Sequence, residues 1–100
     1  MAEELVKALR RVPKVKAVAL VSQEGVSGDE LPEEVLKLKQ VIHQLEEMSE
    51  YIGSQLTSAQ VEIPLGLVLV ERIDGGYILI LGEKDMNVGR VKLALKKYLK

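Results

Sequence analysis

The sequence predicts an α+β three-layer sandwich. In this fold a mainly antiparallel sheet of four to five strands has one long helix on one face and two terminal helices on the other. Short apolar runs at 15–21, 67–70 and 77–81 show almost no alternation, which is typical of strands covered on both faces. Segments with helical spacing lie at both ends of the chain and in its middle. A helical layer on each face of the sheet accounts for both observations.

The N-terminal part of the chain predicts a helix, a strand and a turn. Apolar residues recur at helical spacing over 2–11, and Pro13 disfavours helix in the residue before it. The apolar run 15–21 follows as the first strand, and we expect a turn at 23–25. Residues 26–28 are compatible with a short strand or with a continuation of the turn.

A long helix is expected over 32–56. Pro32 precedes Glu33 and Glu34, and proline in the first turn followed by acids is a helix-start signal. Apolar side chains then recur every three or four residues. They are Val35, Leu38, Val41, Ile42, Leu45, Met48, Ile52 and Leu56. A helix of about 25 residues would be ~37 Å long, which exceeds the width of a domain this small, so we expect it to overhang its sheet.

A half-buried strand is expected over 61–65. Apolar residues at positions 61, 63 and 65 alternate with Glu62 and Pro64. Because Pro64 has no backbone donor, this strand is expected at a sheet edge or at a bend.

Two signals place the last strands and the last helix. Asp74-Gly75-Gly76 separates two apolar runs, and glycine supplies the positive φ that a tight hairpin requires. Asn87 is expected to open a helix that continues to Leu99. The lysines of this helix crowd its C-terminal end and are Lys92, Lys96, Lys97 and Lys100.

The composition excludes several kinds of function. One hundred residues suit a single domain spanning 1–100. The absence of cysteine excludes disulfides and thiolate chemistry, and one histidine cannot build a histidine-based zinc site within one chain. A net charge of -1 and only three aromatic residues argue against a nucleic-acid partner.

We therefore predict a non-enzyme, with no catalytic residue, no cofactor and no metal site. No apolar run approaches the ~20 residues that cross a bilayer, so we expect no membrane insertion and a cytoplasmic protein. A single Asn and a single Thr beside abundant Glu and Lys are compatible with a thermophilic source.

Charge is unevenly distributed along the chain. Residues 29–50 carry a net charge of -5 and residues 84–100 a net charge of +5. Such poles could steer a charged protein partner. The alternative is that the charges have no partner: a solvated helix face carries charge in any case, and basic residues suit the negative C-terminal end of a helix.

The apolar stripe of the long helix is wider than one sheet contact requires. We expect the excess to form a homodimer, with the edge strand pairing across the same two-fold axis. The predicted interface residues are Leu38, Val41, Ile42, Leu45, Met48, Ile52, Val61 and Ile63.

Two stretches of the chain resemble the Roadblock family, also called the dynein light-chain Roadblock type, in its bacterial or archaeal form. Residues 15–22 followed by Glu24-Gly25 are similar to the family's first strand and its acidic-Gly turn. Residues 76–81 leading into 85–91 are similar to its last strand and its Asn-x-Gly helix opening. The resemblance implies a homodimer that binds a small Ras-like GTPase as activator, co-regulator or docking platform, without catalysis of its own. A dimerisation or scaffold subunit that does not sense nucleotide is the alternative.

The sequence departs from the family pattern in one place. Only residues 26–31 separate the acidic-Gly turn from the long helix, where the family has a full second strand and several linking residues. We expect the second strand to be missing or minimal.

Overall fold

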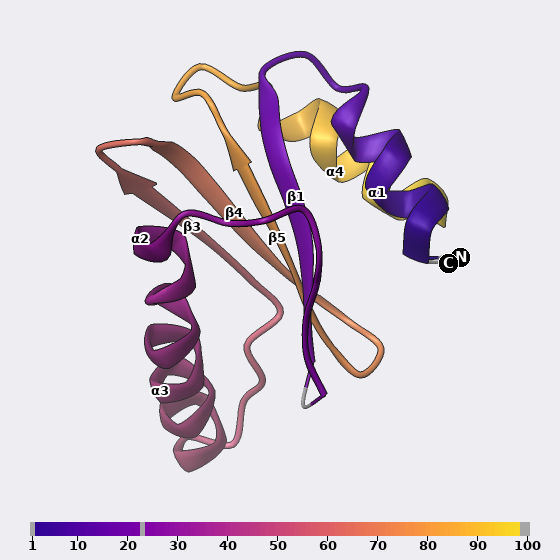
Figure 1. Ribbon diagram of the computed structural model, residues 1–100. Coiled ribbons are helices and arrows are strands. Elements are labelled where there is room, and N and C mark those ends of the chain that lie inside the picture. Colours follow the sequence, from indigo (N-terminus) through magenta and orange to yellow (C-terminus); the bar gives the residue numbers. More distant parts are fainter. Residues whose placement is uncertain (1, 23, 99–100) are drawn as a thin grey trace.

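A computed structural model describes residues 2–22 and 24–98 as a five-stranded antiparallel sheet between two helical layers (Figure 1). The elements are α1 (Ala2–Arg10), β1 (Val15–Ser22), β2 (Gly25–Gly28), α2 (Glu33–Leu36), α3 (Leu38–Tyr51), β3 (Ser58–Ile63), β4 (Gly66–Ile73), β5 (Gly76–Gly82) and α4 (Val88–Tyr98). The strand order is β2-β1-β5-β4-β3. Helices α1 and α4 lie on one face, and α2 and α3 on the other, so the predicted α+β sandwich is confirmed (Figure 1). Gln23, Leu99 and Lys100, which belong to a predicted turn and helix, lie outside the described residues.

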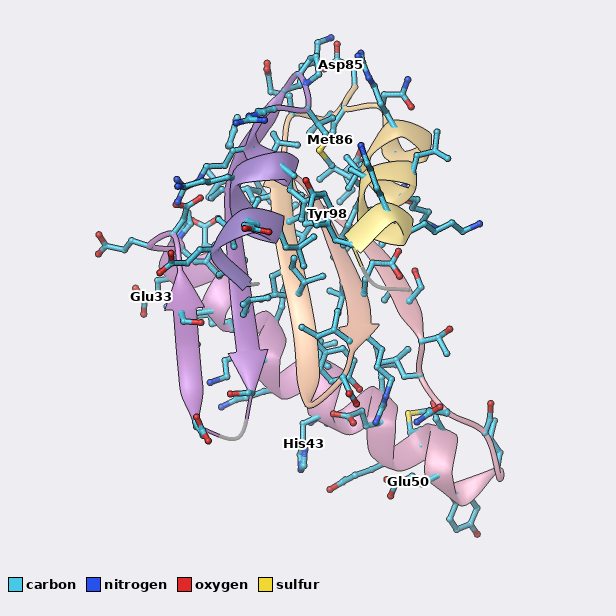
Figure 2. The ribbon with its side chains drawn as sticks, turned by 90° about the vertical axis from the view of Figure 1, so that its right-hand side faces the viewer. Glu33, His43, Glu50, Asp85, Met86 and Tyr98 are labelled. Carbon is cyan, nitrogen blue, oxygen red and sulfur yellow. The ribbon has the colours of Figure 1, made fainter. Side chains whose placement is uncertain are left out.

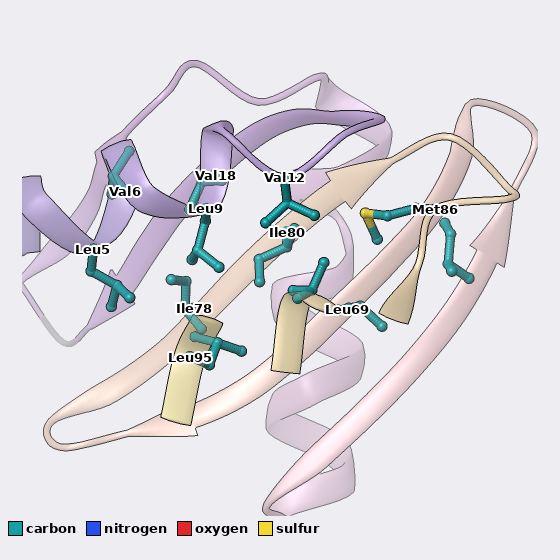
Figure 3. Close-up of a cluster of buried hydrophobic side chains, with 12 residues drawn as sticks. Leu5, Val6, Leu9, Val12, Val18, Leu69, Ile78, Ile80, Met86 and Leu95 are labelled. Atoms are coloured by element: carbon teal, nitrogen blue, oxygen red, sulfur yellow. The ribbon is translucent and has the colours of Figure 1, made fainter. Parts of the chain in front are cut away.

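Each face of the sheet has its own apolar core. The core under α1 and α4 includes Leu5, Leu9, Val18, Leu69, Ile78, Ile80, Val91 and Leu95 (Figure 3). The core under α2 and α3 includes Ala17, Ala19, Val35, Ile42, Val68, Val70, Tyr77 and Leu79. Successive residues of β4 and β5 enter opposite cores, because side chains alternate along a strand. This explains why both runs are continuously apolar.

The second strand is present and short. β2 pairs antiparallel with β1 over four residues. Asp29 continues the pairing, since its N–H donates to Val18 O and its Oδ2 accepts from Val18 N, both at 2.9 Å. Arg10 Nε also donates to Asp29 Oδ2, at 2.9 Å, which ties α1 to this edge. Gly28 has φ +100°, and a Cβ there would lie 2.8 Å from Val18 O, so glycine is required.

The long helix ends earlier than predicted. A turn at Lys37 with αR backbone angles joins α2 to α3, so the helical direction continues through it. After Ile52 the chain turns at Gly53, whose φ is +73°. Ser54 N–H donates to Ser49 O at 2.7 Å and Gly53 N–H to Glu50 O at 3.0 Å, which is a Schellman C-cap. The predicted helical stretch 53–56 is therefore wrong.

The edge position of β3 is confirmed, but its predicted boundaries are not. Ile63 pairs with Gly66, which leaves Pro64 and Leu65 as a two-residue turn. Pro64 therefore removes no donor from the strand. The hairpin predicted at Asp74-Gly75 is confirmed, since Ile73 pairs with Gly76.

The predicted start of the last helix is confirmed by its N-cap. Asn87 Oδ1 accepts a hydrogen bond from Arg90 N at 3.1 Å. The carbonyl of the same residue accepts from Val91 N at 3.2 Å. Asn87 thus satisfies a helix N–H that has no partner within the helix.

Candidate functional site

Helix α3 crosses one face of the sheet diagonally. Figure 2 shows it running from the side of β2, near Glu33, to a point beyond β3, where Glu50 lies. Of the described residues of α3, only Ile42 is buried, at 6 % exposure. Apolar packing onto the sheet is therefore concentrated in α2 and the first half of α3.

A second apolar stripe follows α3 beside the sheet-facing side. Its members are Leu38, Val41, Leu45, Met48 and Ile52, which we call the α3 stripe. They alternate in spacings of three and four residues, as the apolar positions of paired helices do. Val41, Met48 and Ile52 are 43 %, 65 % and 76 % exposed, and the other two are half-buried. At 100° per residue, the exposed members lie roughly a quarter turn from Ile42, so they face sideways rather than into the core.

The edge strand β3 extends this apolar surface. Ala59, Val61 and Ile63 are half-buried and alternate with exposed polar residues. Ala59 and Ile63 pack against the α3-side core, which places the alternating set on the same sheet face as α3. As an edge strand, β3 has backbone N–H and C=O groups without a strand partner on its outer side. The α3 stripe together with Val61 and Ile63 is called the α3–β3 surface below.

The structure sorts the eight predicted interface residues into two groups. Seven of them form the α3–β3 surface. Ile42 is the exception, because it is buried in the chain's own core, whereas Leu38 and Ile63 pack against that core but stay half-buried. The sequence could not separate it from Val41, since both are β-branched apolar residues next to each other in the helix. Whether the seven contact a partner stays a prediction.

On the other side of α3, an open groove separates the helix from the ends of β1 and β5. It has a volume of about 1320 Å³ and is lined by residues that include Ser22, Lys39, His43, Arg72 and Tyr77. His43 is exposed, with its Nε2 3.2 Å from Glu47 Oε1 on the same helix. The lining mixes these basic side chains with acidic ones, which include Glu24, Glu46 and Asp74.

One cluster in this groove ties α3 to the sheet. Arg72 Nη1 donates to Tyr77 Oη at 3.1 Å and lies 3.6 Å from Glu46 Oε2 on α3. It also donates to Leu56 O, at 3.4 Å, in the segment that leads to β3. The sequence alone did not predict this cluster. The two-residue hairpin at Asp74-Gly75 was the available signal, because it makes Arg72 and Tyr77 cross-strand partners.

Tyr77 is the titratable group that this cluster perturbs most. Burial, followed by the hydrogen bonding and negative charge of Glu46, raises the pKa of Tyr77 to about 12. The phenol therefore stays neutral at physiological pH and contributes packing and a hydrogen bond. It is not poised for proton transfer.

Three kinds of feature are absent from the residues that the structure describes. In residues 2–22 and 24–98 no three His, Asp or Glu side chains are grouped to hold a metal ion. Within the same ranges no polar or charged residue is buried. None of the helices described there has the length and apolar character to span a bilayer. The outstanding feature is thus an apolar surface beside a strand edge.

These features define a small three-layer α+β domain with an open sheet edge and an exposed helix stripe. No family model matches the chain, and no curated protein matches it. The fold is similar to the crystal structure of a Roadblock/LC7 domain from Streptomyces avermitilis. The TM-score is 0.67 at 18 % sequence identity, and the match covers 94 % of this chain and 88 % of that chain. The chain therefore has the Roadblock/LC7 fold.

Proposed function

We propose that the chain is a non-catalytic homodimeric interaction module that binds and regulates a small Ras-like GTPase. The observation that carries the dimer is the α3–β3 surface. It joins a heptad-like apolar stripe to an unpaired strand edge on one side of the molecule. A two-fold axis beside β3 would use both at once, joining the two sheets and laying the two α3 helices side by side.

Charge favours an antiparallel arrangement of the two helices. Glu46, Glu47 and Glu50 lie at the C-terminal end of α3. A parallel pair would bring the three carboxylates of each copy together, whereas an antiparallel pair places them at opposite ends of the interface. Pro64 lies in a turn, so it removes no N–H from β3, and the outward-pointing N–H groups of alternate residues are free to pair with a second β3.

The GTPase part of the proposal rests on the similarity to Roadblock proteins. The proposal assigns the chain no catalysis of its own, as the similarity to Roadblock proteins implies for a regulator or docking platform. Arg72 contacts Glu46, Tyr77 and Leu56 O within its own chain. These contacts assign its guanidinium to the fold and not to the nucleotide site of a partner GTPase.

Introducing a negative charge at Met48 tests the dimer. Light scattering coupled to size-exclusion chromatography is expected to give a dimer for the native chain and a folded monomer for Met48→Glu. Glu47→Lys is a suitable control, because it reverses a charge on the neighbouring solvent side of α3. A native chain that is monomeric at high concentration would refute the dimer.

Affinity capture tests the partner. Immobilised protein is incubated with lysate of the source organism containing GDP or a non-hydrolysable GTP analogue. We expect a Ras-like GTPase to be retained mainly with the GTP analogue, and Met48→Glu to retain less of it. The same partners in both lanes, without a GTPase, would favour the scaffold. The shortness of β2, which has four residues, favours the scaffold alternative, because it shortens one edge of the sheet relative to the family pattern.

A further inference from the structure

The two helical layers carry opposite charge. The segments that contain α1 and α4, residues 2–14 and 84–98, hold nine basic residues against three acidic ones, a net charge of +6. The segment that contains α2 and α3, residues 30–51, holds two basic residues against six acidic ones, a net charge of -4. Since α1 and α4 lie side by side on one face, the fold converts a mixed sequence into a basic face and an acidic face (Figure 1).

Helix α4 presents a leucine among cations at the outside of the basic layer. Val91 and Leu95 face the core, and Leu93 points the opposite way and is 69 % exposed. Arg90 lies one turn before Leu93, and Lys96 and Lys97 lie one turn after it. At helical spacing these three cations surround the leucine on the outer face.

Several cations of this layer are already neutralised within the fold. Arg10 pairs with Asp29, Lys14 with Asp85, and Lys92 with Glu71 at 3.8 Å. The other six cations of this layer make no ion pair of this kind among residues 2–22 and 24–98, and all are exposed: Lys7, Arg11, Lys84, Arg90, Lys96 and Lys97. The outer surface of α1 and α4 is therefore richer in unpaired positive charge than the rest of the described chain.

We propose that the outer face of α1 and α4 docks peripherally on an anionic lipid bilayer. Clusters of lysine and arginine on an amphipathic helix are attracted to anionic headgroups, and a central leucine can enter the headgroup region while the longer lysine stems keep their charges in water. Composition favours lipid over protein, because lysine is depleted in protein–protein interfaces and this face is mainly lysine.

This docking does not depend on the homodimer or on the GTPase. A two-fold axis perpendicular to the sheet would place the basic layers of both copies on one face, and the acidic layers with the α3 stripes on the other. Docking through the basic face would then leave the acidic face open to a protein partner. A monomer has the same basic face with half the charge.

Vesicle co-sedimentation tests the proposal. The full chain is mixed with phosphatidylcholine vesicles and with vesicles in which one third of the lipid is phosphatidylglycerol. We expect binding to the anionic vesicles alone, with release at about 1 M salt, where the screening length falls to about 3 Å. The double variant Lys96→Glu/Lys97→Glu should weaken binding by at least on the order of 30-fold, since each surface cation contributes roughly fivefold.

The acidic face supplies a matched control. Lys37→Glu/Lys39→Glu changes the net charge by the same amount on the opposite layer and should retain most of the binding. Leu93→Ser, at an exposed helix position that tolerates serine, should lower the affinity several-fold and leave the salt dependence unchanged. Equal losses in both double variants, equal binding to neutral vesicles, or no binding by the folded native chain would each overturn the proposal. So would tighter binding to duplex DNA than to the anionic vesicles.

Discussion

Arg72 on β4 and Tyr77 on β5 are cross-strand partners, and Nη1 of the arginine donates to the phenol oxygen at 3.1 Å. The same guanidinium lies 3.6 Å from Glu46 on α3. One side chain thus links two strands to the helix that carries the exposed stripe. Because α3 itself contributes only one buried side chain, the position of its C-terminal half depends on this polar contact as well as on apolar packing.

Replacing Arg72 by methionine should loosen that attachment. Glu46 and Arg72 are both partly exposed, so the ion pair contributes modestly and we expect a loss of about 1 kcal/mol in the free energy of unfolding. Urea unfolding followed by circular dichroism measures it. Arg11→Met removes an exposed arginine outside the cluster and should change stability by less than about 0.5 kcal/mol. Equal effects of the two variants would contradict the anchoring role.

Alkaline pH should destabilise the protein through Tyr77. The native state holds the pKa of Tyr77 at about 12, above the ordinary value of 10.0, so the folded chain keeps this proton when the unfolded chain has lost it. The contribution is fully present below about pH 10 and is lost as the pH rises to about 12, on the order of 2 kcal/mol in all.

Tyr77→Phe is the corresponding test, because phenylalanine cannot ionise. We expect its unfolding free energy to fall less steeply than that of the native chain between pH 10 and pH 12. In a Tyr51→Phe/Tyr98→Phe background, ultraviolet absorbance follows Tyr77 alone and should report a pKa near 12. A midpoint at the ordinary value of 10.0 would show that the phenol is not held by the fold.

Alanine substitutions should distinguish the buried residues of α3 from the exposed ones by their effect on stability. Ile42→Ala removes buried atoms and is expected to cost about 2–4 kcal/mol. Met48→Ala removes exposed atoms and should cost less than about 0.5 kcal/mol of monomer stability. Thermal or urea unfolding of the two single variants, at a dilution where the native chain is monomeric, checks the contrast. Comparable losses at the two positions would mean that α3 is rotated relative to the sheet.

Two glycines with positive φ should respond differently to alanine. At Gly28, φ is +100° and the new Cβ would lie 2.8 Å from Val18 O, so we expect a loss of about 2–3 kcal/mol. At Gly53, φ is +73° but no atom lies within 4 Å of the new Cβ, so the loss should be about 1 kcal/mol. Unfolding free energies of the two variants give the comparison, and a larger loss at Gly53 would speak against the close contact of β2 with β1.

Elements whose signal is local were predictable from the sequence. Continuous apolar runs predicted β4 and β5, Asp74-Gly75 predicted their hairpin, and Asn87 predicted the start of α4. The C-cap at Gly53 was also local, but the apolar spacing that continues to Leu56 concealed it. Periodicity records where apolar side chains recur and does not record where the backbone turns.

By itself, the sequence determined the three layers, because strands that are apolar on both faces require helices on both sides. The tertiary structure alone decided which apolar residues of α3 are core and which are surface. Ile42 and Val41 are neighbours of nearly the same chemistry, and only the rotation of the helix about its axis buries one and exposes the other. It also decided that the charges separate into two faces, since α1 and α4 come from opposite ends of the chain and meet only through packing.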